Sequence, residues 1–98
     1  MNPMKMMKQF QEMQARLEKE LDQLSVTASS GGEMVTVTMN GRKELQSIKI
    51  DKQVIDPADP EMLQDLIVAA LAECGRKVDE TVAAKVSNLG GGLKLPGF

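Results

Sequence analysis

A strand-like stretch, residues 34–39, lies between two long helical patterns, and this arrangement constrains the fold more than any other feature. Apolar and hydroxyl side chains alternate along it with the period of a β-strand: Val35, Val37 and Met39 against Thr36 and Thr38. Residues 25–28 are expected to begin an earlier strand and residues 29–32, which include two glycines, to form its turn. Asn40-Gly41 is predicted to form a two-residue hairpin turn with positive φ angles.

A third strand is predicted over residues 44–51. Ile48 and Ile50 alternate cleanly, but Leu45 has the opposite parity. Either a β-bulge near Ser47 or partial cover of both faces would account for this difference. The sequence leaves both alternatives open.

Two long helices are predicted, over about residues 4–24 and 60–89. The first has one apolar stripe at steps of three and four residues: Met6, Phe10, Met13, Leu17, Leu21 and Leu24. The second begins at Asp59-Pro60, because the Asp side chain can accept from free backbone N–H groups and the proline loses no hydrogen bond there. It is expected to stop at Gly90, and residues 90–98 to form a flexible tail.

The helices are too long for a compact monomer. At about 1.5 Å per residue they span roughly 30 and 45 Å, whereas a compact domain of about 100 residues has a radius of gyration near 13 Å. We therefore expect one α+β domain, residues 1–98, with projecting helices and a homodimer in which the sheets join. The expected dimer contacts are apolar residues of the strands and second helix: Val35, Val37, Ile48, Ile50, Leu63, Leu66, Ile67 and Ala70.

Composition argues against several classes of function. The chain has two aromatic residues, no histidine and one cysteine, so it lacks common acid–base and metal-ligand sets. Cys74 shares a helical face with Leu71 and Val78 and is expected to be a buried, inert thiol. No apolar run approaches the roughly 20 residues that span a bilayer. We expect a cytoplasmic protein that is not an enzyme and has no cofactor, metal, small-molecule substrate or membrane partner.

Charge is distributed unevenly. The net charge of −2 and the pI near 5.1 differ from the basic balance of an ordinary DNA-binding domain. Residues 1–16 nevertheless carry a net charge of +2, whereas residues 53–65 carry four acids: Asp56, Asp59, Glu61 and Asp65. A basic tip on an acidic body would orient a polyanion rather than exclude it.

Several segments in order resemble the YbaB/EbfC family of bacterial nucleoid-associated proteins. They are residues 31–41 (GGEMVTVTMNG), 48–51 (IKID), 61–70 (EMLQDLIVAA) and 92–98 (GLKLPGF), together with the Met- and Gln-rich opening at residues 4–14. The resemblance extends over essentially the whole chain. It implies an α-β-β-β-α subunit, an intertwined homodimer with protruding helices, and binding to double-stranded DNA with modest sequence preference. Family-like DNA contacts would map to Lys5, Lys8, Arg16, Lys19, Arg76, Lys77 and Lys85.

Two classes of function remain as alternatives. In the first, a dimer binds the backbone of duplex DNA through Lys and Arg side chains and affects nucleoid organisation and gene expression. In the second, the Met-rich stripe makes the chain a coiled-coil-like adaptor for a partner protein, since flexible methionines suit adaptable apolar surfaces. The reactivity of Met4, Met6, Met7 and Met13 toward a mild oxidant would distinguish an exposed docking surface from a covered one.

Overall fold

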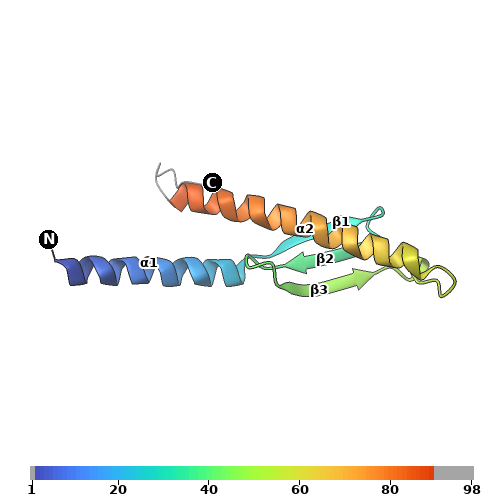
Figure 1. Ribbon diagram of the computed structural model, residues 1–98, viewed down its shortest axis with the longest axis horizontal. Helices are drawn as coiled ribbons and strands as arrows, with labels where there is room; N and C mark the ends of the chain where they lie inside the picture. The colour runs from blue at the N-terminus through green and yellow to red at the C-terminus, as the bar shows by residue number, and fades with distance from the viewer. Residues whose placement is uncertain (1, 90–98) are drawn as a thin grey trace.

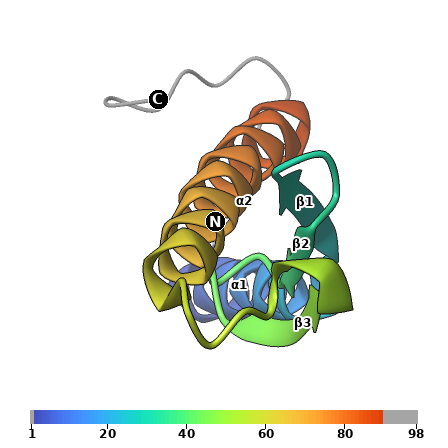
Figure 2. The same ribbon diagram turned by 90° about the vertical axis from the view of Figure 1, so that its right-hand side faces the viewer.

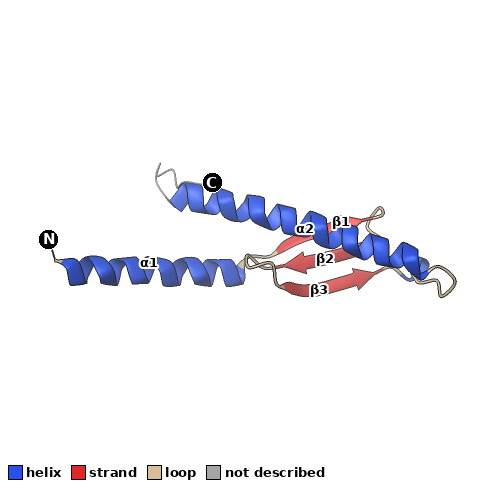
Figure 3. Ribbon diagram, viewed as in Figure 1, coloured by secondary structure: helices blue, strands red, loops and turns tan. Residues whose placement is uncertain are grey.

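The computed structural model describes residues 2–89, which form two long helices and a three-stranded antiparallel sheet (Figure 1, Figure 3). The predicted α-β-β-β-α order is confirmed, with one short 3₁₀ helix added before the second long helix. The elements are α1 (Pro3–Gln23), β1 (Val26–Ser30), β2 (Val35–Met39), β3 (Leu45–Ile50), η1 (Lys52–Val54) and α2 (Pro60–Leu89). The flexible tail expected over residues 90–98 lies outside the described residues.

Both long helices begin at a proline, and the side chain of the residue before it caps the helix N-terminus. The side chain of Asn2 accepts a hydrogen bond from the Met4 N–H (3.1 Å), and α1 starts at Pro3. At the start of α2, Asp59 accepts from the Met62 N–H (3.3 Å), as its position in the sequence predicted. The predicted starting point of the second helix is therefore confirmed.

The first strand is longer than expected. Ser29 pairs with Thr36 and Ser30 pairs with Val35, so the prediction that these serines belong to the turn is wrong. The turn instead occupies residues 31–34. Its two glycines adopt positive φ angles, 60° at Gly31 and 66° at Gly32, which is the conformation that glycine allows at no steric cost. The hydroxyl pairs across β1 and β2 favour the extra ladder positions.

The irregular parity of β3 comes from a β-bulge. Thr38 pairs with Ser47 whereas its neighbour Met39 pairs with Leu45, so Gln46 is the extra residue. The bulge places Leu45 on the same face of the sheet as Ile48 and Ile50. Of the two alternatives left open by the sequence, the bulge near Ser47 is confirmed.

The connection between β2 and β3 is wider than the predicted two-residue turn. Asn40 N–H donates to the Glu44 carbonyl (3.1 Å), and Lys43 N–H donates to the Asn40 carbonyl (3.1 Å). The positive φ angle falls on Lys43 (63°) rather than on Asn40-Gly41. The reason is the buried side chain of Asn40, whose Oδ1 accepts from the N–H groups of Arg42 and Glu44 and so holds a longer loop. We call residues 40–44 the junction loop.

The core lies between α2 and one face of β1 and β2, as the view along the long axis shows (Figure 2). Its buried side chains are Val26, Ala28, Val35, Val37, Met39, Ala70, Cys74 and Val78. The expected burial of the Cys74 thiol is confirmed, and its Sγ donates to the Val26 carbonyl (3.3 Å). The opposite face of the sheet carries hydroxyl pairs, Thr27 with Thr38 (3.1 Å) and Ser29 with Thr36 (3.0 Å).

The molecule is elongated. Its principal extents are 68 × 21 × 16 Å and its radius of gyration is 18.5 Å, against about 13 Å for a compact domain of this length. Both long helices extend beyond the sheet in the same direction (Figure 1). No residue of α1 is buried. The prediction that both helices project past the sheet is therefore confirmed.

Candidate nucleic-acid interface

The basic side chains of α1 lie together on the face opposite its apolar stripe. At about 100° per residue they fall within an arc of about 80°, centred roughly 140° from the stripe. They are Lys5, Lys8, Arg16 and Lys19. All four are exposed, and none has an ion-pair partner among residues 2–89. We call these four residues the basic face of α1. Glu12 is the one acid of α1 that falls within the same arc, so this face keeps a net positive charge.

The N-terminal half of α1 stands clear of the rest of the subunit (Figure 1). Lys5 and Lys8 lie in its first two turns, at one end of the long axis. The first turn of any helix has backbone N–H groups without intrahelical partners, and their partial positive charge adds to that of the two lysines. A large anion can therefore approach this tip without contacting the acidic body.

Arg76 of α2 is occupied by two acids of its own helix. Its guanidinium is paired with Glu73 one turn before it and with Glu80 one turn after it. The hydrogen bond from Arg76 lowers the pKa of the Glu73 carboxyl, and the same bond raises the pKa of the guanidinium. Arg76 is thus part of a neutralised cluster, and a phosphate would have to compete with two carboxylates for it.

The other two candidate cations of α2 also have partners. Lys77 Nζ donates to the carbonyl of Thr27 (3.4 Å), a residue of the edge strand β1. Lys85 Nζ lies 3.7 Å from Glu20 Oε2 of α1. The seven candidate residues therefore divide into two groups: the basic face of α1, and three residues of α2 that each have a polar contact within the subunit.

Two basic residues of the junction loop were not singled out by the sequence analysis. Arg42 Nε lies 2.7 Å from Asp22 Oδ1 of α1, and Lys43 Nζ lies 2.8 Å from Asp79 Oδ1 of α2. The available signal was a pair of adjacent cations in a turn between two strands. That pattern is common on solvated turns. The acids that pair with these two cations are distant in the sequence, so only the fold shows the ion pairs.

The residues expected at the dimer interface differ widely in exposure. Val35, Val37 and Ala70 are fully buried between α2 and the sheet within one subunit, so their apolar area is already covered there. Four others are half-buried against the same core: Ile50, Leu63, Leu66 and Ile67. Ile48 is 41% exposed. α1 carries five exposed large apolar side chains, Met4, Met6, Met7, Phe10 and Met13, and α2 carries two, Met62 and Val68.

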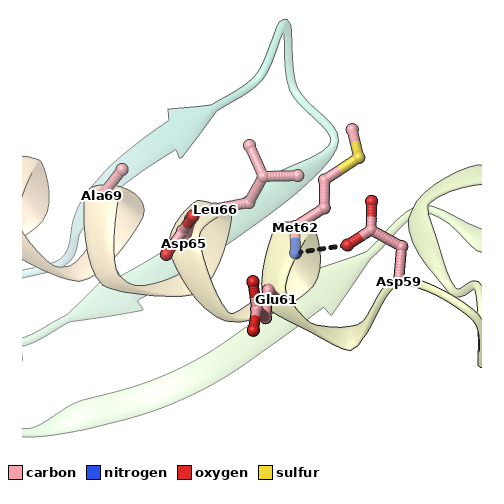
Figure 4. A pocket seen from close by; sticks show the side chains of 6 residues that line it. All are labelled: Asp59, Glu61, Met62, Asp65, Leu66 and Ala69. Carbon is pink, nitrogen blue, oxygen red and sulfur yellow. Dashed lines mark hydrogen bonds between the residues drawn. The ribbon is translucent and has the colours of Figure 1, made fainter.

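The start of α2 carries an open, acidic hollow (Figure 4). Asp59, Glu61 and Asp65 line it together with Met62, Leu66 and Ala69. No group of three or more metal-ligating side chains is placed to hold a metal within residues 2–89. The hollow lies near the opposite end of the molecule from the tip of α1 (Figure 1), so the charge separation predicted from the sequence extends along the long axis.

These features define a class of protein: an α+β subunit whose helices project from a small sheet, with a basic face on one of them. Residues 1–93 match the sequence model of the YbaB/EbfC DNA-binding family, and the chain belongs to this family. The resemblance stated from the sequence is therefore confirmed. This is a family of nucleoid-associated DNA-binding proteins and not of enzymes.

Individual relatives agree with this assignment. The chain is 50% identical over 97 residues to a nucleoid-associated protein of Syntrophobacter fumaroxidans, covering 99% of this chain and 88% of the relative. It is 51% identical over 100 residues to a nucleoid-associated protein of Moorella thermoacetica, covering 99% and 96%. Among solved structures, the uncharacterized protein HP0035 from Helicobacter pylori matches with a TM-score of 0.76 at 26% identity, covering 91% of this chain and 97% of that one. Neither helix within residues 2–89 combines the length and the hydrophobicity needed to cross a bilayer.

Proposed function

We propose that this protein binds double-stranded DNA in the nucleoid as a homodimer, chiefly through phosphate contacts, and thereby affects nucleoid organisation and gene expression. The observation that supports this proposal is the basic face of α1, where four cations project to one side of an arm that stands clear of the body. Lys and Arg contacts to phosphates give affinity and register without reading the base sequence. Arg76, Lys77 and Lys85 are secondary candidates, because each already has a partner within the subunit.

Duplex DNA is a better fit than single strands. Proteins that bind unpaired bases place aromatic side chains beside their cations so that the bases stack. Phe10 is the one aromatic residue within residues 2–89, and it belongs to the apolar stripe, away from the basic face. The basic face therefore offers charge to a phosphate backbone but no stacking platform for bases.

The homodimer is supported by the apolar surface that one subunit leaves uncovered. Along α1, Phe10 is 65% and Met13 62% exposed. A continuous stripe of this kind on a long helix is typical of a surface that another polypeptide covers. A second copy that covers the stripe would leave the basic face of α1 turned outward, toward DNA.

The first test of this function is the salt dependence of binding to a random-sequence duplex. If each subunit makes three phosphate contacts, the six contacts of a dimer imply that affinity falls about 10³-fold between about 50 and 200 mM salt. Fluorescence anisotropy measures the affinity, and light scattering gives the mass of the free protein. Binding that is absent, or that does not change over this range, would contradict a phosphate-directed mechanism.

A second candidate function, an adaptor that docks a partner protein, is favoured by the exposed methionines of α1. Met4 is 80% exposed and lies well off the stripe, about 140° from its centre at about 100° per residue, whereas Met6 and Met13 lie on it. We expect a dimer to slow peroxide oxidation of Met6 and Met13 relative to Met4, which peptide mass spectrometry resolves. Equal and rapid oxidation of all three would indicate that no second copy covers the stripe, and would favour the adaptor.

A further inference from the structure

The junction loop lies at the end of the sheet from which α1 and α2 project as two arms (Figure 1). Its residues contact both helices. Three consecutive residues make these contacts. Gly41 meets Leu21 near the end of α1, Arg42 pairs with Asp22 of α1, and Lys43 pairs with Asp79 of α2. The loop therefore joins the two arms to each other as well as joining β2 to β3.

Gly41 is packed directly against the backbone of α1. Its N–H donates to the Leu21 carbonyl (2.8 Å). A Cβ atom at position 41 would lie 2.9 Å from the Leu21 oxygen, closer than Cβ atoms come to backbone atoms, and 3.0 Å from the Leu21 Cα, a contact that requires the neighbour to shift. The φ angle of Gly41 is not positive, so this position needs glycine for room and not for its backbone conformation. A side chain here would move the end of α1.

Lys43 adopts a conformation that is unfavourable for a residue with a side chain. Its φ angle of 63° lies in the left-handed region, where glycine would be free of strain. A glycine could not make the contact between Lys43 Nζ and Asp79 Oδ1 (2.8 Å). The backbone conformation at position 43 would favour glycine, but only a residue with a side chain can form this link to α2.

The rest of α1 has little else to hold its direction. Its polar contacts with the other described elements come from Glu20, Leu21 and Asp22, at the C-terminal end, and no α1 residue is buried. The ion pairs are solvent-exposed, and exposed pairs add little to folding stability. A weak contact at the base of a long, otherwise free helix can still bias the direction in which that helix points.

We propose that the junction loop is a positioning device that sets the angle between α1 and α2, and hence the spacing of the DNA contacts along the arms. Gly41 fixes the approach of α1, and the ion pairs of Arg42 and Lys43 hold the two helices from either side. The second part of this inference, the spacing of DNA contacts, rests on the proposed function. The first part, the angle between the arms, concerns the free protein alone.

The angle is measured by pulsed electron spin resonance on spin labels at two exposed positions, introduced as Gln14→Cys in α1 and Ser87→Cys in α2. Labelled chain is mixed with a large excess of unlabelled chain, so that the distances within one subunit dominate. Cys74 is buried, so we expect the label to react with the two introduced cysteines under native conditions. We expect Arg42→Asp to broaden the distance distribution, and the charge swap Asp22→Arg with Arg42→Asp to narrow it again. A distribution that Arg42→Asp leaves unchanged would overturn the proposal.

Gly41→Ala tests the consequence for DNA without changing any charge. We expect it to shift the mean distance between the labels and to weaken duplex binding by roughly 3- to 10-fold, because misplaced arms lower the effective concentration of the second contact. The slope of affinity against salt should stay the same, since no phosphate contact is removed. Gly75→Ala is the matched control, because nothing lies within 4 Å of the added carbon.

Separate outcomes distinguish failure of the inference from failure of the proposed function. A shifted distance in Gly41→Ala supports the positioning role even if the wild-type chain does not bind DNA. Unchanged distances in both Gly41→Ala and Arg42→Asp overturn it even if the wild type binds tightly. A lowered melting temperature with unchanged distances would show a purely structural role for the loop, which also overturns the proposal.

Discussion

Reversal of two charges at the tip of α1, Lys5→Glu with Lys8→Glu, should weaken binding to a random-sequence duplex by at least about 100-fold at low salt. In a dimer the change removes four cations from the basic face and puts four carboxylates in their place. Both lysines are exposed and neither has an ion-pair partner within residues 2–89, so folding does not depend on them. Fluorescence anisotropy measures the loss, and circular dichroism and light scattering check that helix content and mass are retained.

The matched control is Lys49→Glu with Lys52→Glu. It makes the same change in net charge at exposed positions near the end of β3 that points away from α1 (Figure 1). If the affinity for DNA depends on where the charges lie, the control variant loses little affinity and keeps its slope of affinity against salt. Equal losses in the two double variants would mean that net charge alone governs binding, and retained affinity in the first would remove the tip of α1 from the interface.

The fold could be predicted from local patterns because its elements have strong local signals. The stripe of α1 has a regular helical period, and Asp59-Pro60 combines an acceptor with a residue that tolerates the first helical position. The alternation in residues 35–39 has no helical interpretation. Even the bulge in β3 was visible as a parity conflict, although the pairing partner was needed to place the extra residue at Gln46.

The turns were harder because their conformation depends on side chains that reach across them. Asn40-Gly41 is a common hairpin dipeptide, yet the Asn40 side chain bonds to Arg42 and Glu44 and so favours a loop with its positive φ angle at Lys43. The serines at the end of β1 resemble turn residues by composition. Their hydroxyls instead extend the ladder and reach α2, where Ser30 donates to the Leu66 carbonyl (2.6 Å).

Partners of charged and apolar surfaces were the least predictable feature. A stripe of apolar residues shows that a face is covered but does not show which element covers it. Val37 and Ala70 could therefore be expected at a dimer contact, although the structure buries them between α2 and the sheet of one subunit. Likewise, Lys85 differs from Lys5 and Lys8 through Glu20, an acid that folding brings beside it from α1, whereas both acids beside Arg76 stand one helical turn away in its own helix. Sequence spacing finds neighbours one helical turn apart, whereas Glu20 and Lys85 are far apart in the chain.

The uncovered stripe of α1 yields the second large effect. Phe10→Asp with Met13→Asp should raise the dissociation constant of the dimer by at least about 10³-fold, because burial of each large apolar side chain contributes roughly 1.5–3 kcal/mol and both subunits lose two. The subunit itself should remain folded, since no α1 residue is part of its core. Light scattering over a dilution series gives the dissociation constant, and urea unfolding of the monomer reports its stability.

Two further variants serve as controls for this result. Val37→Asp places a charge at a site that is 0% exposed, so it should unfold the subunit and abolish the dimer together. Gln9→Asp with Gln14→Asp adds the same charges to exposed polar positions of α1, and should leave the dimer intact. A dimer that survives Phe10→Asp with Met13→Asp would show that a second copy covers some other surface. The exposed stripe would then be free for a different protein, as the adaptor function requires.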